Sequence, residues 1–328
     1  MRDSIQAWQK ILAQGFSCAH DLLTYLQLPT TLASPGAEKQ FKTRVPRGFA
    51  ARMQPGNRHD PLLLQVLALD DELQTTNEYV QDPLQELAVN PRKGLMHKYH
   101  SRVLLTLTGA CAINCRYCFR RHFPYQDNNP GRLGWQPALD YIAADTSIKE
   151  VILSGGDPLL ATDNALAPLF EQLGAIAHLS TLRIHTRFPV VLPERINPGL
   201  LDLLAALPLH KVIVMHSNHA QELGDNFAQA CIDLRKAGCH LLNQSVLLRA
   251  VNDDAVVLAA LSERLFACGV LPYYLHLLDK VQGAGHFDIS LAKAQVIFTE
   301  LQALLPGYLV PRLAREDAGK KNKTLLIG

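Results

Sequence analysis

Residues 103–118 read VLLTLTGACAINCRYC, a short apolar run followed closely by three cysteines. Short apolar runs bounded by turn residues are typical of buried β-strands. Similar runs follow at 151–153, 182–185, 212–215, 241–246 and 273–277, with helical patterns between them. Strands that alternate with helices predict a parallel sheet covered by helices, and six strands are too few to close an eight-stranded barrel. We therefore expect an α/β fold, an open partial (β/α)6 TIM-like barrel.

Polar residues gather directly after these predicted strands. In parallel α/β folds, ligands bind at the carboxyl ends of the strands, in the loops that lead to helices. A structural protein has no reason to collect chemically active groups at one end of a sheet. The clusters are 111–118, 154–157, 186–187, 216–218 and Asp279, and Gln244 lies within the fifth run.

The bulk composition is that of a soluble globular enzyme. The chain has 328 residues, of which 48% are hydrophobic and 19% charged, with a formal net charge of +2. This balance gives no indication of nucleic-acid or membrane binding, and no apolar run is long enough to cross a bilayer. The N-terminus has no signal-peptide pattern, so we expect a cytoplasmic protein. Clustered cysteines in that compartment are metal ligands or nucleophiles more often than disulfide partners.

Cys111, Cys115 and Cys118 are the cysteines that cluster. Three thiolates on one loop can converge on a metal centre and leave one coordination position open. A cubane iron–sulfur cluster with three protein ligands has one iron free to bind a small molecule. A structural zinc site, with His122 as the fourth ligand, is the alternative that the spacing leaves open.

The C-x3-C-x2-C spacing, Phe119 after it, and the later Gly155-Gly156-Asp157 together resemble the signature of the radical S-adenosylmethionine (SAM) superfamily. The resemblance implies that the three cysteines hold a [4Fe–4S] cluster whose open iron binds SAM. One electron from the reduced cluster would then cleave SAM to methionine and a 5′-deoxyadenosyl radical. The Gly-Gly-Asp turn would lie against the amino group of SAM, since glycine permits close backbone approach.

From about residue 45 to residue 324 the chain resembles the lysine 2,3-aminomutase family. The most telling runs are 97–99 with Arg102, 111–121, 185–187, 243–249, and Asp279 followed by 285–287. The family uses pyridoxal 5′-phosphate (PLP) beside the cluster and SAM, and the resemblance assigns the PLP-binding Schiff-base lysine to Lys323. Where the family has several glycines before this lysine, this sequence has only Gly319, and Lys320 and Lys321 precede Lys323 closely.

The resemblance also assigns residues to substrate and cofactors. Arg120 corresponds to the arginine that binds the substrate carboxylate, and Asp279 and Glu316 to the two acids that bind the distal ammonium group of lysine. Glu316 is one methylene longer than the usual aspartate. Tyr99 and Arg102 match positions that contact the PLP phosphate, and His216 and Gln244 match polar positions around SAM and PLP.

These observations predict three regions: a helical N-terminal extension (1–95), the radical SAM partial barrel (96–310) and a short C-terminal PLP-lysine tail (311–328). The expected enzyme is an isomerase that converts L-α-lysine to (R)-β-lysine. The chain resembles the bacterial branch that supplies β-lysine for modifying translation elongation factor P through a lysyl ligase, with a reductant such as flavodoxin. An aminomutase of lysine catabolism, and a non-catalytic iron–sulfur or zinc-binding module, are the alternatives.

Overall fold

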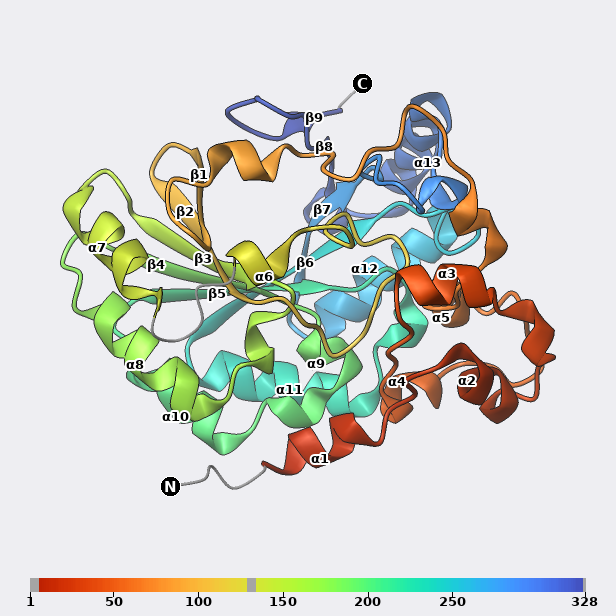
Figure 1. Ribbon diagram of the computed structural model, residues 1–328, viewed down its shortest axis with the longest axis horizontal. Helices are drawn as coiled ribbons and strands as arrows, with labels where there is room; N and C mark the ends of the chain where they lie inside the picture. Colours follow the sequence, from red (N-terminus) through yellow and green to blue (C-terminus); the bar gives the residue numbers. More distant parts are fainter. Residues whose placement is uncertain (1–5, 129–133, 327–328) are drawn as a thin grey trace.

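A single sheet organises the molecule. The computed structural model describes residues 6–128 and 134–326, and within them nine strands pair in sequence order from β1 to β9 (Figure 1). Strands β2 to β8 are parallel, whereas β1 and β9 are antiparallel to their neighbours at the two edges. No pairing joins β1 to β9 in the described chain, so the sheet is an open, partial barrel.

All six predicted strands are present. They are β2 (Arg102–Thr108), β3 (Glu150–Gly155), β4 (Thr181–Thr186), β5 (His210–His216), β6 (Cys239–Val246) and β7 (Leu271–His276). A seventh parallel strand and the two antiparallel edge strands were not predicted: β8 (Arg312–Arg315), β1 (Leu95–Tyr99) and β9 (Thr324–Leu325).

One long helix follows each of the six predicted strands. The Asp254 carboxylate accepts hydrogen bonds from the amides of Val256 and Val257 at 2.8 and 3.2 Å and so caps the N-terminus of the helix that follows β6. The apolar side chains Leu258, Leu261 and Leu265 are buried. The six helices are α7 (Gln136–Ala144), α8 (Asp163–Gly174), α10 (Pro198–Ala206), α11 (Asp225–Lys236), α12 (Ala255–Ala267) and α13 (Leu291–Leu304).

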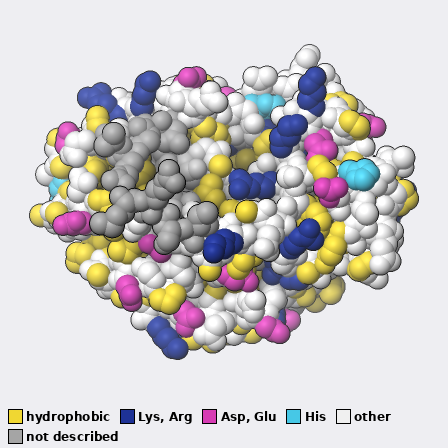
Figure 2. Space-filling model, turned by 60° about the horizontal axis from the view of Figure 1, so that its bottom comes forward, with side chains coloured by type: hydrophobic (Ala, Val, Ile, Leu, Met, Phe, Trp, Pro, Cys, Tyr) yellow, Lys and Arg dark blue, Asp and Glu magenta, His cyan; other side chains and the backbone are white. Residues whose placement is uncertain are grey.

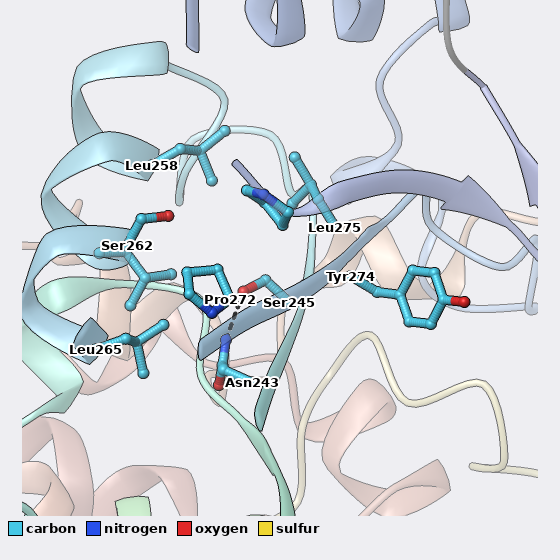
Figure 3. A pocket seen from close by; sticks show the side chains of 10 residues that line it. Asn243, Ser245, Leu258, Ser262, Leu265, Pro272, Tyr274 and Leu275 are labelled. Atoms are coloured by element: carbon cyan, nitrogen blue, oxygen red, sulfur yellow. Dashed lines mark hydrogen bonds between the residues drawn. The ribbon is translucent and has the colours of Figure 1, made fainter. Parts of the chain in front are cut away.

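Alternation along the strands separates a helix-covered face from an inner face. Figure 3 shows Leu258 of α12 and Ser245 of β6 lining one small pocket, and the Ser245 hydroxyl accepts a hydrogen bond from the Asn243 side-chain amide at 3.0 Å. Tyr274 of β7 points away from α12 in the same view. Gln244, between Asn243 and Ser245, lines the cavity on the inner face. The period of two in a strand therefore sends packing residues outward and site residues inward.

The N-terminal part is made of short helices and turns that pack below and beside the barrel (Figure 1). Trp8 is buried with its ring 5.6 Å from Phe188, edge to face, and both belong to one hydrophobic core. The division of the chain into three regions stays a prediction, and residues 1–5 of the first region lie outside the described chain. The remaining short elements are α1 (Ala7–Ala13), α2 (Ala19–Tyr25), η1 (Thr30–Leu32), α3 (Pro35–Gln40), α4 (Arg47–Ala50), α5 (Pro61–Leu64), η2 (Asp70–Leu73), η3 (Glu86–Val89), α6 (Tyr125–Asn128), η5 (Pro158–Leu160), α9 (Phe188–Val191), η6 (Pro193–Arg195), η7 (Ala220–Glu222), η8 (Gly285–Phe287) and η9 (Gly307–Leu309).

Acidic and basic side chains are mixed over the face of the molecule seen in Figure 2. In the part of the chain that the structure describes, no helix has both the length and the apolar character needed to span a membrane.

Candidate active site

A cavity of about 490 Å³ opens on the inner face of the sheet, at the carboxyl ends of the parallel strands. This volume falls in the range of about 300–1,000 Å³ that is usual for small-molecule sites. The structure brings to this one cavity every residue that the resemblance assigns to a cofactor or to the substrate. They are Tyr99, Arg102, Cys111, Cys115, Cys118, Arg120, Gly155, Gly156, Asp157, His216, Gln244, Asp279, Glu316 and Lys323.

The three cysteines lie close enough to influence one another electrostatically. Burial raises the pKa of Cys111 well above its ordinary value, and the neighbouring Cys118 and Cys115 raise it further. Burial, followed by Cys115, raises the pKa of Cys118 to about 11. Burial therefore disfavours the thiolate forms of Cys111 and Cys118, which need a positive partner. An iron–sulfur cluster would supply that positive partner, so the three residues fit such a cluster.

The geometry does not favour a single zinc ion. Among the described residues, no three His, Cys, Asp or Glu side chains are placed to hold one metal ion. His122, the suggested fourth zinc ligand, is outside the cavity lining, and its Nε2 lies 3.1 Å from the Gln282 carbonyl oxygen. In a cubane cluster each cysteine binds a different iron, so the thiols need not meet around one ion.

Arg187 contacts the cysteine loop through Cys115, a role that the sequence did not reveal. Its Nη1 donates to Cys115 Sγ at 2.6 Å, and its Nη2 donates to Gln65 Oε1 at 2.7 Å and Glu222 Oε2 at 2.9 Å. Gln65 Nε2 closes the network by donating to Glu222 Oε1 at 3.0 Å. A buried guanidinium needs a carboxylate partner to offset the loss of hydration, so Glu222 stabilises Arg187 in its position against Cys115.

The Gly-Gly-Asp turn packs against the loop that carries the cysteines. Gly155 has φ +115, and a side chain on it would lie 2.6 Å from the Thr108 carbonyl oxygen. A side chain on Gly156 would clash with the Ala110 carbonyl, and the Asp157 amide donates to that same carbonyl at 2.9 Å. Only glycine permits this approach, which forms part of the cavity wall.

Asp157 connects the loop that follows β3 to the end of β4. Its carboxylate accepts hydrogen bonds from the Thr186 hydroxyl at 2.7 Å and from the Arg187 and Leu159 amides at 2.7 and 3.1 Å. Burial nonetheless raises its pKa to about 6, because desolvation outweighs the effect of these hydrogen bonds. Asp157 therefore holds the cavity wall in place.

The arginines of the cysteine motif bind carboxylates of the N-terminal part. Glu72 accepts from Arg116 Nε at 2.7 Å and Nη2 at 2.5 Å, and from Arg121 Nη2 at 2.7 Å. Arg116 and Glu72 are fully buried. Arg120, which lies between Arg116 and Arg121 in the sequence, binds a different carboxylate, Glu86. The loop that carries the cysteines is thus fixed to η2 and η3 by charge-assisted hydrogen bonds.

Lys323 lies in a cluster of charged groups at another side of the cavity. Its Nζ donates to Glu316 Oε2 at 2.5 Å, while Lys98 Nζ donates to Glu316 Oε1 at 2.7 Å. The Tyr99 hydroxyl also donates to Glu316 Oε1, and the Arg102 guanidinium lies 4.5 Å from the centre of the Tyr99 ring. Although burial opposes ionisation, the lysines and the tyrosine hydroxyl lower the pKa of Glu316 to about 2.

Asp279 differs from Glu316 because its carboxylate has no hydrogen-bond or ion-pair partner among the described residues. Burial raises its pKa to about 7, and the attraction of Lys323 offsets only part of this effect. A half-buried carboxylate that faces a cavity without a partner is suited to binding a cation that enters the cavity.

His216 is held as a neutral ring. Its Nε2 lies 2.8 Å from the Tyr117 hydroxyl, and the two rings stack with centroids 5.7 Å apart. Burial, followed by the positive charge of Arg187, lowers the pKa of His216 to about 3. Neutral imidazole and the amide of Gln244 can each exchange hydrogen bonds with a polar ligand in the cavity.

The lining residues thus fit all three expected cofactors. Cys111, Cys115 and Cys118 would hold the cluster. The wall made by Gly155 and Gly156, with His216 and Gln244, offers close backbone approach and neutral polar groups for SAM. An amine at Lys323, beside cationic Arg102 and the Tyr99 hydroxyl, suits an aldehyde that carries a phosphate.

Comparison with known proteins agrees with this site. Residues 101–186 match the family described as a 4Fe-4S single cluster domain. The chain is 51% identical over 322 residues to the L-lysine 2,3-aminomutase of Haemophilus influenzae, covering 98% of this chain and 95% of that protein. The L-lysine 2,3-aminomutase of Escherichia coli is 50% identical over 327 residues, with the same coverage.

More distant relatives include the L-lysine 2,3-aminomutase of Clostridium subterminale, 36% identical over 288 residues, covering 87% of this chain and 69% of that protein. Among solved structures, a radical SAM methyltransferase from Sphaerobacter thermophilus matches 67% of this chain and 68% of its own with a TM-score of 0.46 and 17% identity. The chain belongs to the L-lysine 2,3-aminomutase family, and it is an isomerase whose cofactors are a [4Fe–4S] cluster, SAM and PLP.

Proposed function

We propose that this protein converts L-α-lysine to (R)-β-lysine. The observation that supports the proposal most strongly is the lining of the cavity on the inner face of the sheet. The three cysteines and the amine of Lys323 line it together with Arg120, Asp279 and Glu316. An α-amino acid with a distal ammonium group carries the charges that complement Arg120 on one side and the two carboxylates on another.

When bound, the cofactors supply the radical and the conjugated system that stabilises it. The protein's own residues bind and orient. Lys323 would hold PLP, Arg120 would bind the substrate α-carboxylate, and Asp279 and Glu316 would bind the distal ammonium group. Opposite charges at two places in one cavity select for a diamino acid over glutamate, which carries a second carboxylate.

We also propose that the product serves to modify translation elongation factor P. The chain spans 95% of the length of the relatives from Haemophilus influenzae and Escherichia coli, to which it is 51% and 50% identical. It spans 69% of the length of the Clostridium subterminale protein, to which it is 36% identical. This pattern favours the short bacterial branch over an enzyme of lysine catabolism. The proposal includes a cytoplasmic location, a reductant such as flavodoxin, and a lysyl ligase that consumes the β-lysine.

The test is an anaerobic assay of the purified protein with reconstituted cluster, lysine, SAM, PLP and dithionite. Chromatography on a chiral column with detection by mass spectrometry measures each enantiomer of β-lysine. A Lys323→Ala variant is assayed in parallel with the wild type. We expect the (R) enantiomer from the wild type and none from the variant. Adding elongation factor P and its ligase should then produce a mass increase on the factor.

Other outcomes separate the alternatives. If 5′-deoxyadenosine forms without β-lysine, the protein is a radical SAM enzyme with another substrate. If the cluster assembles but neither product forms, the non-catalytic module gains support. If β-lysine forms but the factor is not modified in the presence of an active ligase, the catabolic role is favoured.

A further inference from the structure

The buried ion pair between Arg120 and Glu86 lies in the cavity wall. Glu86 Oε2 accepts from Arg120 Nε at 2.7 Å, and Glu86 Oε1 accepts from Arg120 Nη2 at 2.6 Å. The exposed fractions of the two side chains are only 7% for Arg120 and 11% for Glu86. This is the two-point geometry by which a guanidinium binds a free carboxylate.

The remaining donors of Arg120 are mostly used as well. Its Nη1 donates to the Ser154 hydroxyl at 2.9 Å and to the Gly155 carbonyl at 3.3 Å. Within the described chain this leaves a single N–H, on Nη2, without an acceptor. A substrate carboxylate therefore cannot make a two-point contact with Arg120 while all four of these hydrogen bonds persist.

Glu86 is carried by a segment with little regular structure. It begins η3 (Glu86–Val89), and the preceding Gln85 has φ 51, a left-handed conformation. The side chain of Asp82 accepts from the amide of Glu86 at 3.1 Å. Short turns of this kind rearrange at smaller cost than a strand or a long helix, so Glu86 is the more mobile partner of the pair.

We propose that Glu86 occupies the carboxylate-binding fork of Arg120 until the α-carboxylate of the substrate displaces it. Glu86 is thus an internal competitor that neutralises a buried guanidinium in the substrate-free protein and lowers the affinity for the incoming amino acid. The inference rests on the proposed function, because it takes the substrate carboxylate to bind at Arg120.

The test compares wild type with Glu86→Gln, using protein loaded with cluster, SAM and PLP but given no reductant, so that no turnover occurs. Calorimetry measures the Kd for L-lysine and for L-lysinamide, which lacks the carboxylate. Glutamine keeps the shape of Glu86 but not its charge. We expect lysine to bind about tenfold more tightly to the variant, the value of one hydrogen bond to a charged group, and lysinamide to bind equally to both.

The control is Glu78→Gln, which removes the same charge from an exposed ion pair with Lys280. It should leave both Kd values unchanged. An unchanged or weaker affinity of Glu86→Gln for lysine would overturn the proposal, as would an equal gain for lysinamide. If the wild type binds no lysine at all, both the proposed function and the inference about Glu86 fail. If the wild type binds lysine but the variant shows no gain, this inference alone fails.

Removing one member of a buried ion pair can prevent folding. Hydrogen exchange of the wild type then decides the question without a variant. Lysine, but not lysinamide, should increase exchange of the amides in residues 82–89, because Glu86 loses its contact with Arg120. Unchanged or reduced exchange in this segment on binding lysine would overturn the proposal.

Discussion

Replacing Asp279 by asparagine is expected to stabilise the protein when no cofactor is bound, and to abolish lysine binding when the cofactors are present. Asp279 is half-buried in the cavity wall without a hydrogen-bond partner among the described residues, and its pKa rises from 3.8 to about 7. A carboxyl group with a higher pKa in the folded chain than in the unfolded chain costs nothing below the unfolded value. The cost grows as the pH rises and is complete above the folded value.

The size of the effect follows from this shift. One pKa unit corresponds to ~1.4 kcal/mol, so the ionised Asp279 carboxylate costs the folded state about 4 kcal/mol above neutral pH. Between about pH 5 and about pH 8 the advantage of Asp279→Asn over wild type should therefore grow by about 3 kcal/mol, or about 5 °C in melting temperature. Circular dichroism of both proteins at the two pH values measures the difference.

The matched control is Asp202→Asn, which changes an exposed carboxylate on α10. Its melting temperature should follow that of the wild type at both pH values. If Asp279→Asn gives the same stability difference at both pH values, Asp279 does not carry an uncompensated buried charge. If the variant still binds lysine with wild-type affinity, Asp279 does not bind the substrate's ammonium group.

Two further substitutions test the support of the cysteine loop. Glu72→Gln leaves the buried Arg116 and the nearby Arg121 without their carboxylate, so we expect the free energy of unfolding to fall by about 3–5 kcal/mol. The melting temperature measures this loss, and an unchanged melting temperature would show that this ion pair is not needed. Gly156→Ala places a methyl group against the Ala110 carbonyl and should displace the cysteine loop, so that iron content after reconstitution falls by more than half. Gly307→Ala, which has open space around it, should retain full iron content, and equal iron in both variants would contradict the packing argument.

The parallel strands and the position of the site could be predicted because their signals are local. Five of the six runs are followed by polar residues, the fifth contains Gln244, and parallel strands bring their carboxyl ends together. Strand β8 was missed because Arg312–Arg315 is only four residues long and has two apolar residues between two arginines, which is neither an apolar run nor an alternating pattern. Its assignment depends on pairing with β7, which the sequence alone does not display.

The partners of the site residues could not be predicted for a different reason. Glu86 lies 34 residues from Arg120 and Glu72 lies 44 residues from Arg116, in turns without a periodic pattern. Many exposed carboxylates have the same local sequence character, so only the folded chain reveals which ones are buried against an arginine. Their burial follows from the packing of the N-terminal part on the cysteine loop.

The contact between Glu316 and Lys323 was likewise not foreseen. Both residues were assigned by resemblance, one to substrate and one to PLP. In the structure they form an ion pair, and Lys98 binds the same carboxylate. Glu316 therefore has two lysine partners, whereas Asp279 has none among the described residues, a difference that spacing along the chain could not convey.

That Lys323 holds PLP in the same cavity as the three cysteines is tested most directly by identifying the modified lysine. The protein is loaded with PLP, reduced with borohydride and digested, and the peptides are analysed by mass spectrometry. We predict a phosphopyridoxyl group on Lys323 in wild type and none on its peptide in Lys323→Ala. Attachment to Lys98, which contacts the same carboxylate, or to Lys320 or Lys321 in place of Lys323 would contradict this assignment.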